Sequence, residues 1–471
     1  MPSAKVHPAI IGQANCIIGT KSWTLTPSGC CPEAVTTTLA TRADRRHLAL
    51  AAAADRRLIE PLAGFVDLAG LRESVAELMD AFAPLGQVQH TVAVKACGLA
   101  PVLRLLADLG VDAEVASPGE TAVAEAAGVR GARLVLDSPA KTTDELAHAL
   151  AEGTAINADN FQELARLDAL IGAAVPKSVL GLRINPQIGA GRIGDTSTAT
   201  DTSKFGIPLR DDRGLLIEAV ARRPWLTRLH VHVGSQGCPL GLMADGVAAV
   251  YELAEQINTE LGRRQITSID LGGGLPVNFA SDEPGPTYRD YVATLQARIP
   301  GIGDGRYTFV TEFGRSLLAK NGFLVGTVEY TKVAGGRRIA VTHAGAQVAA
   351  RTVLQPEHWP LRIGAFDPAG VPKTGPLVPQ DIAGPLCFAG DLLARERPLP
   401  LLDQGDLVVA HDTGAYYFGA HYAYNTLPRP AVHGFTLEHG EVRFSPIRRA
   451  QSLAELVADA GGEYVEALPK A

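Results

Sequence analysis

The chain has 471 residues, of which 46% are hydrophobic and 20% charged, and its formal net charge is −7. That length suits two domains, and the composition is that of a soluble globular protein with a substantial core. The acidic balance argues against a nucleic-acid partner, and no apolar run reaches the ~20 residues that a membrane helix requires.

The cysteines and the N-terminus point to a compartment. No basic and then apolar signal region opens the chain, and six cysteines are scattered along it without metal-ligand spacing. We therefore expect reduced thiols, a cytoplasmic location and no bound metal. The cysteines are Cys16, Cys30, Cys31, Cys97, Cys238 and Cys387.

Taken in chain order, residues 1–57 show no clear period, and we expect this segment to pack partly on the C-terminal β domain described below. From Gly64 onward, short β-branched runs alternate with amphipathic stretches of helical period. Strands are predicted at 65–66, 92–94, 113–116, 134–136, 155–158, 179–184, 229–233, 268–271 and 309–312. About eight such units, joined by helical crossovers, favour a closed (β/α)₈ barrel over residues 58–320.

The pattern changes after about residue 320. Strands are predicted at 323–333, 338–342, 406–410 and 442–444, separated by Gly, Pro and Asp turns, with one helix near 452–460. We expect a second, mainly β domain over residues 321–471.

Several side chains that carry chemistry stand where barrel strands end, which is the end that faces the active site. Lys95 follows an apolar strand and can form a Schiff base, although strands also end in solvated lysines. His230 and His232 alternate onto one face, with Ser235 beyond them. They could ligate a metal, pack on a cofactor ring, or be hydrogen-bonded core histidines.

Two further strand ends complete the set. Gly272, Gly273 and Gly274 end a strand as either a phosphate-binding nest or an ordinary turn. Glu312 and Arg315 could pair with a pyridinium nitrogen and a phosphate, or form an internal salt bridge. Together these groups are the parts that a pyridoxal-phosphate (PLP) site needs.

On these motifs the sequence resembles the fold-type III PLP decarboxylases, the group of diaminopimelate, ornithine and biosynthetic arginine decarboxylases. The resemblance runs from about residue 58 to 432 and implies a homodimer with shared active sites that acts on a small amino acid. In the barrel its motifs are 93–96, 114–120, 183–186, 203–206, 232–235, 272–274 and 312–315. In the second domain they are 384–387, Asp391, 405–406, 414–416 and 424–425.

The resemblance also implies roles for single residues. Lys95 would be the Schiff-base lysine, His232 would stack on the pyridine ring, Glu312 would pair with the ring nitrogen and Glu114 would line the cofactor site. Cys387 would be the acid supplied by the second subunit, with Asp391 beside it in the substrate pocket. The phosphate would be bound by Ser235, Gly272, Gly273, Gly274, Arg315 and Tyr416, and Gly314 would also contact the cofactor.

The positions that handle substrate depart from the family pattern. Phe388 stands where diaminopimelate decarboxylases have an acidic residue that recognises the distal amino group. Arg351 matches an arginine that binds a substrate carboxylate, but Gln355 replaces the usual tyrosine. We therefore predict a PLP-dependent amino-acid decarboxylase whose substrate is not meso-diaminopimelate.

Two alternatives remain. Racemases of the same fold place an arginine at the ring nitrogen and use a tyrosine base, so Glu312 argues against a racemase. A non-catalytic regulatory relative would have lost the lysine or the phosphate-binding residues, and both are present.

Overall fold

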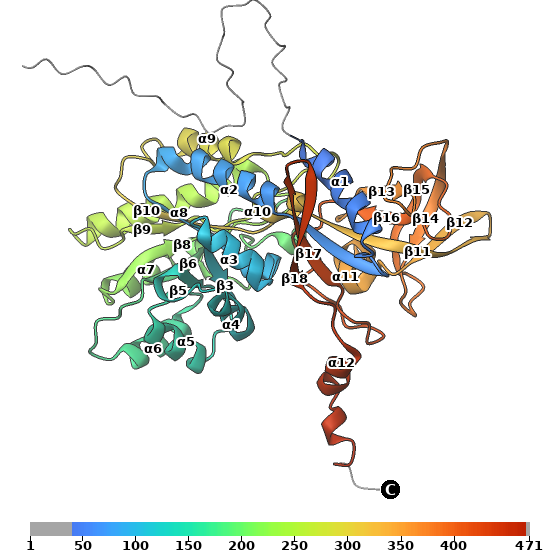
Figure 1. The fold of residues 1–471 in the computed structure, drawn as a ribbon. Helices are drawn as coiled ribbons and strands as arrows, with labels where there is room; N and C mark the ends of the chain where they lie inside the picture. The colour runs from blue at the N-terminus through green and yellow to red at the C-terminus, as the bar shows by residue number, and fades with distance from the viewer. Residues whose placement is uncertain (1–39, 468–471) are drawn as a thin grey trace, which may run out of the picture.

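The computed structural model describes residues 40–467, and within that range eight parallel strands close into a barrel. Each strand pairs with its neighbours, and β10 pairs with β2 to complete the ring. In order round the barrel the strands are β2 (Val88–Ala93), β3 (Asp112–Val115), β4 (Leu134–Leu136), β5 (Ala155–Ala158), β6 (Leu180–Asn185), β8 (Leu226–His230), β9 (Ser268–Asp270) and β10 (Thr308–Phe313). The predicted barrel is therefore confirmed (Figure 1).

A helix follows every barrel strand, and local signals set where several of these helices begin. Ser117 caps α4, while Thr142 and Thr287 form capping boxes with Glu145 and Asp290. The helices of this part are α2 (Leu68–Phe82), α3 (Ala100–Asp108), α4 (Pro118–Ala126), α5 (Thr143–Glu152), α6 (Phe161–Ile171), α7 (Leu209–Ala221), α8 (Leu240–Glu260), α9 (Tyr288–Arg298) and α10 (Arg315–Leu318). Short pieces are η1 (Ala83–Leu85), η2 (Val94–Ala96), η3 (Gly131–Arg133), η4 (Gly194–Thr196), η5 (Ala319–Asn321) and the strand β7 (Ile207–Pro208).

The second part of the described chain is a mainly antiparallel sheet that lies beside the barrel (Figure 1). Its strands are β1 (Leu62–Asp67), β11 (Gly322–Ala334), β12 (Arg337–Thr342), β13 (Ile363–Phe366), β14 (Leu377–Ala383), β15 (Leu392–Pro400), β16 (Leu407–Ala410), β17 (Ala431–Glu438) and β18 (Glu441–Arg448). Its helices are α1 (Arg42–Asp55), α11 (Ala346–Leu354), α12 (Leu453–Asp459) and η6 (Gly462–Tyr464).

The strand around Phe65 and Val66 requires a correction, because the sequence pattern places it in the barrel. The structure pairs β1 antiparallel with β11 and parallel with β17, so it belongs to the second sheet. The Phe65 ring stacks on Phe323 at 5.2 Å, and α1 covers the same cluster through Leu50. A short buried strand has the same hydrophobic pattern in either sheet, so only its pairing with distant strands decides the sheet to which it belongs.

The N-terminal segment is described only in part. Helix α1 packs on the second sheet and is tied to its surroundings by charge: Arg45 lies 2.7 Å from Asp67, and Arg46 lies 3.0 Å from Asp282 of the barrel. Residues 1–39, with Cys16, Cys30 and Cys31, lie outside the described residues. Among the residues that are described, no helix is both long and apolar enough to cross a membrane.

Candidate active site

Lys95 stands directly after β2, in the short turn η2. Its Nζ atom donates to Oε2 of Glu114 on the neighbouring strand β3 at 2.5 Å. The Glu114 side chain is 1% exposed, whereas that of Lys95 is 45% exposed at the barrel mouth. Desolvation acts to lower the pKa of Lys95, but the Glu114 carboxylate raises it above its ordinary value. A buried carboxylate thus holds an ammonium group that a ligand can still reach.

His232 follows β8 and lies against the glycine loop that ends β9. Its Nδ1 accepts the N–H of Gly273 at 3.1 Å, so the neutral ring carries its proton on Nε2. Burial lowers the pKa of His232 well below its ordinary value, which keeps the ring uncharged. An uncharged imidazole with a fixed tautomer suits packing against an aromatic ligand.

The glycine loop is packed against two other strand ends. A Cβ atom on Gly273 would lie 2.0 Å from the carbonyl oxygen of Glu312, and one on Gly274 would lie 1.8 Å from that of Gly234. The Glu312 N–H donates to the Gly272 carbonyl at 2.8 Å. Only glycine permits this close approach of backbones, which brings the loop beside both Ser235 and Glu312.

Glu312, on β10, is buried and incompletely paired. Its Oε2 lies 3.5 Å from Nε2 of His230, and its Oε1 is buried without a hydrogen-bond partner. Burial raises its pKa well above the ordinary value, and the nearby Glu114 and Asp137 add to the rise. A buried carboxyl with one unused oxygen is suited to a ligand's ring nitrogen.

Arg315 begins α10 between two aromatic rings. Its guanidinium carbon lies 4.5 Å from the ring centroids of both Trp359 and Tyr416. Arg351 of α11 lies over the same rings, at 5.3 Å and 4.6 Å. Burial, reinforced by Arg351, lowers the pKa of Arg315 to about 10, so it remains a cation at pH 7. The Arg315 guanidinium is therefore a cation held in place by aromatic rings, which suits it to pair with a phosphate.

Tyr416 connects this pair of arginines to the lysine. Its N–H donates to the Ala96 carbonyl at 2.7 Å. A Cβ atom on Gly314 would lie 2.8 Å from Cβ of Ala96 and 3.4 Å from the Tyr416 hydroxyl. Tyr416, Gly314 and the Lys95 turn therefore meet at the barrel mouth.

The residues predicted to handle substrate lie on other elements. Cys387 and Phe388 are exposed on the loop between β14 and β15, where the Cys387 N–H donates to Oδ1 of Asn425 at 2.8 Å. Asp391 differs from its predicted role as a substrate contact. It is 3% exposed, and its two oxygens accept backbone N–H bonds from Ala346 and Leu386 at 2.7 and 2.8 Å. Within this chain Asp391 orders the start of α11.

Four residues of the site have no role in the sequence analysis. Asp137 accepts a bond from Arg183 at 3.0 Å, and Asp270 accepts from Asn157 and from the Gly272 N–H, both at 3.0 Å. Burial, reinforced by the charge of Glu312, raises the pKa of Asp270 to about 6. Asp137 and Asp270 carry the same signal as Glu312, an acid at a strand end, and Arg183 stands within a recognised motif. No such signal marks Trp359.

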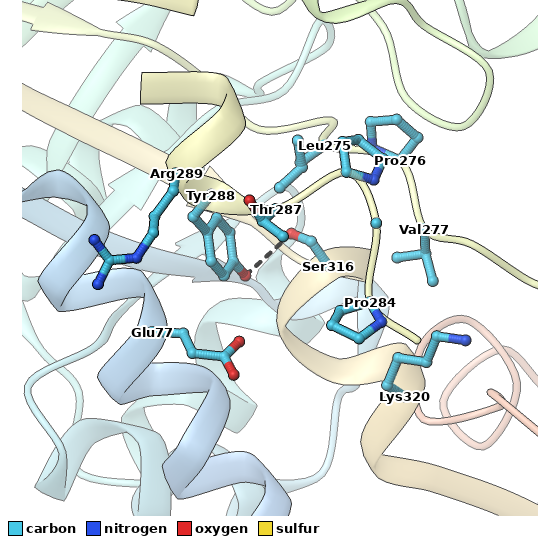
Figure 2. A pocket seen from close by; sticks show the side chains of 12 residues that line it. Glu77, Leu275, Pro276, Val277, Pro284, Thr287, Tyr288, Arg289, Ser316 and Lys320 are labelled. Atoms are coloured by element: carbon cyan, nitrogen blue, oxygen red, sulfur yellow. Dashed lines mark hydrogen bonds between the residues drawn. The ribbon is translucent and has the colours of Figure 1, made fainter. Parts of the chain in front are cut away.

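A separate cavity of about 270 Å³ lies behind α10. Figure 2 shows the Tyr288 hydroxyl bonded to Ser316 on one of its walls, with Glu77 and Lys320 on others. None of the predicted site residues lines it. The cavity is lined by Glu77, Leu275, Pro276, Val277, Pro284, Gly285, Pro286, Thr287, Tyr288, Arg289, Ser316 and Lys320.

The residues at the barrel mouth fit PLP. The Gly273 loop leaves no room for a Cβ and so lets a phosphate approach its backbone, and Arg315 offers charge to that phosphate. Oε1 of Glu312 is unpaired for a ring nitrogen, and Lys95 is accessible to an aldehyde. The ring nitrogen, the phosphate and the aldehyde of PLP therefore each have a matching residue at the barrel mouth.

Comparison with known proteins agrees with this geometry. Residues 68–319 match the family model of the pyridoxal-dependent decarboxylase, pyridoxal binding domain. The diaminopimelate decarboxylase of Pseudomonas fluorescens is 33% identical over 371 residues, which cover 78% of this chain and 85% of that protein.

Solved structures show the same fold. Diaminopimelate decarboxylase from Helicobacter pylori, complexed with L-lysine, has a TM-score of 0.74 at 24% identity and covers 85% of this chain and 97% of its own. Lysine/ornithine decarboxylase from Vibrio vulnificus, complexed with putrescine, has a TM-score of 0.68 at 21% identity and covers 84% and 99%. The chain belongs to the pyridoxal-dependent decarboxylases, and its cofactor is pyridoxal phosphate.

Proposed function

We propose that this enzyme removes the α-carboxylate of an amino acid other than meso-diaminopimelate, with Lys95 binding the cofactor and Cys387 of a second subunit donating a proton. The convergence of Lys95, His232 and Glu312 at the barrel mouth supports the reaction. The proposal includes a homodimer, because Cys387 is exposed and is bonded to Asn425 rather than to the Lys95 cluster of its own chain. It also includes a cytoplasmic location, which the scattered cysteines favour.

When bound, PLP supplies an electron sink for the pair of electrons left when carbon dioxide departs. The protein does the rest. Glu312 would present Oε1 to the ring nitrogen, His232 would pack on the ring, and the loop of Gly273 would hold the phosphate. The Sγ of Cys387 donates a proton to the α-carbon, for which a thiol is suited because its ordinary pKa is within about two units of neutrality.

The substrate pocket lacks the acid that the resemblance ties to a distal ammonium. Phe388 occupies that position and is 45% exposed, and both oxygens of Asp391 are already bonded within the chain. Arg351 has no carboxylate partner among the described residues and can bind a substrate carboxylate. A substrate that lacks a distal ammonium group fits this set best.

Meso-diaminopimelate is the second candidate substrate, because the Pseudomonas fluorescens relative, which is 33% identical, is named a diaminopimelate decarboxylase. The test is carbon dioxide release from the purified protein with added PLP, over a panel of L- and D-amino acids that includes meso-diaminopimelate. Release from an amino acid without a distal amino group, and little from diaminopimelate, supports the proposal. Preference for diaminopimelate would overturn it.

A pair of variants sharpens the substrate question. Phe388→Glu is expected to raise kcat/KM for meso-diaminopimelate and to lower it for the preferred substrate. Phe388→Leu removes the ring without adding charge and serves as the control. If both variants change the two substrates alike, Phe388 does not select the distal group.

A further inference from the structure

His230 is a buried histidine inside the barrel whose ring faces a carboxylate on either side. It is fully buried, and neither ring nitrogen has a hydrogen-bond partner. Nδ1 lies 3.7 Å from Oδ2 of Asp137 on the β4 side, and Nε2 lies 3.5 Å from Oε2 of Glu312 on β10. Among the described residues, His230 supplies the one histidine, lysine or arginine side-chain nitrogen within 4 Å of a Glu312 oxygen.

The other charges that face His230 come from the surrounding strands. Arg183 on β6 donates to Asp137 at 3.0 Å and is itself stacked over the Phe205 ring at 4.5 Å. Glu114 on β3 and Asp270 on β9 add negative charge near His230. Arg228 lies on β8, the strand of His230 itself, and His232 follows the end of that strand. Asp137 is therefore anchored by Arg183, whereas Glu312 has no comparable anchor except His230.

The two oxygens of Glu312 have different surroundings. Oε2 faces His230, while Oε1 is buried and unpaired. An unpaired buried carboxyl oxygen is costly to a folded protein, and a hydrogen-bond donor from a bound ligand would remove that cost. The ring nitrogen of the cofactor is the group that the proposed role of Glu312 places there.

We propose that His230 is a positioning residue for Glu312, which holds Oε2 through Nε2 so that Oε1 faces the ring nitrogen as an ionised carboxylate. This inference rests on the role proposed above for Glu312. Asp137, fixed by Arg183, orients the imidazole from its other side.

The electrostatics of the pair support this role. Burial raises the pKa of Glu312 and lowers that of His230, so burial by itself favours the neutral form of both groups. When a positively charged ring nitrogen faces Oε1, the proton on Oε2 can pass to Nε2 of His230. Asp137 then stabilises the imidazolium, and no proton has to leave the buried cluster.

The test measures the ring nitrogen directly. The enzyme is freed of cofactor and reloaded with PLP labelled with ¹⁵N in the ring, and the ¹⁵N resonance reports whether that nitrogen is protonated. A protonated nitrogen is expected in the wild type. His230→Leu is expected to shift the resonance to the unprotonated position and to raise the cofactor Kd roughly tenfold.

Two further variants separate positioning from packing. His230→Gln keeps a donor near the place of Nε2 but cannot take up the proton as the imidazole does, so it is expected to restore the protonated resonance only in part. Asp137→Asn, which keeps its shape, is expected to shift the resonance part of the way. His90→Leu is the control, because it removes another buried barrel histidine, bonded to Thr311 at 2.8 Å, and is expected to leave the resonance in place.

The outcomes distinguish the two levels of the argument. If Glu312→Gln leaves the ¹⁵N resonance unchanged, Glu312 is not the partner of the ring nitrogen, and both the proposed role and this inference fail. If Glu312→Gln shifts the resonance and folded His230→Leu and Asp137→Asn do not, His230 is a packing residue only.

Discussion

Lys95 and Glu114 form an ion pair between two neighbouring strands of the barrel, with Nζ 2.5 Å from Oε2. The carboxylate is buried and the lysine is half-exposed, so the carboxylate controls the charge of the one amine that must react with an aldehyde. The turn that contains Lys95 also accepts the Tyr416 N–H through the Ala96 carbonyl. Because the Tyr416 ring packs on Arg315, this bond connects the lysine to the expected phosphate site.

Removing Glu114 is expected to make Lys95 easier to deprotonate. Glu114 raises the pKa of Lys95 against the effect of desolvation, so Glu114→Gln lowers that pKa and shifts the pH profile of cofactor capture toward lower pH. The measurement is the rate at which the visible band forms after PLP is added to cofactor-free enzyme between pH 6 and 9.

Two controls accompany this experiment. Lys95→Ala is expected to show no such band. Glu120→Gln removes a nearby carboxylate whose oxygen accepts the Ala116 N–H, and it is expected to leave the profile in place. An unshifted profile in Glu114→Gln would show that Glu114 does not set the lysine's charge.

Trp359 is expected to strengthen cofactor binding although no motif marks it. The Trp359→Leu change removes one of the two rings that hold Arg315, a cation–π contact of roughly 0.5–2 kcal/mol. The cofactor Kd should rise about 2- to 30-fold, as measured by titration of the visible band. Trp225→Leu, next to the opposite end of β8, is the control and should leave Kd unchanged.

Gly273→Ala is expected to be poorly tolerated, because its Cβ would lie 2.0 Å from the Glu312 carbonyl oxygen. Overpacking of this kind costs about 1–3 kcal/mol or more, and here the Glu312 strand end would have to move. Thermal unfolding should show a lower Tm, and PLP should bind more weakly. Gly241→Ala, where a Cβ meets nothing within 4 Å, should change neither.

Asp270 is expected to make stability depend on pH. Its pKa is about 6 in the folded protein against 3.8 as the reference, because burial and the charge of Glu312 disfavour ionisation. The folded state therefore binds the proton more tightly, and stability from this group is present below pH 4 and declines as pH rises to about 6. The full loss is at most about 3 kcal/mol, from a shift of about two units.

Asp270→Asn should reduce that decline. The amide cannot ionise, and Asn157 can turn its unpaired Oδ1 toward the new donor. Comparing Tm at pH 5 and pH 7.5 should show a smaller difference in the variant than in the wild type. The exposed Asp108→Asn is the control, and an equal pH dependence in all three proteins would contradict the assignment.

The sequence by itself determined the barrel and most of the cofactor cluster. Alternating short strands and helices specify a parallel sheet, and residues at strand ends must meet at one mouth once that sheet closes. This is why Lys95, Glu114, His232, Glu312 and Arg315 could be placed together before any contact was known.

Tertiary structure alone decided the rest. The strand at Phe65 belongs to the second sheet, and its sequence did not predict this, because a buried run of six residues does not specify which strand it will pair with. Asp391 turned to backbone N–H groups, Trp359 came to stack on Arg315, and His230 came to lie between Asp137 and Glu312. Each of these depends on side chains from distant segments meeting in space, which periodicity and motif spacing do not encode.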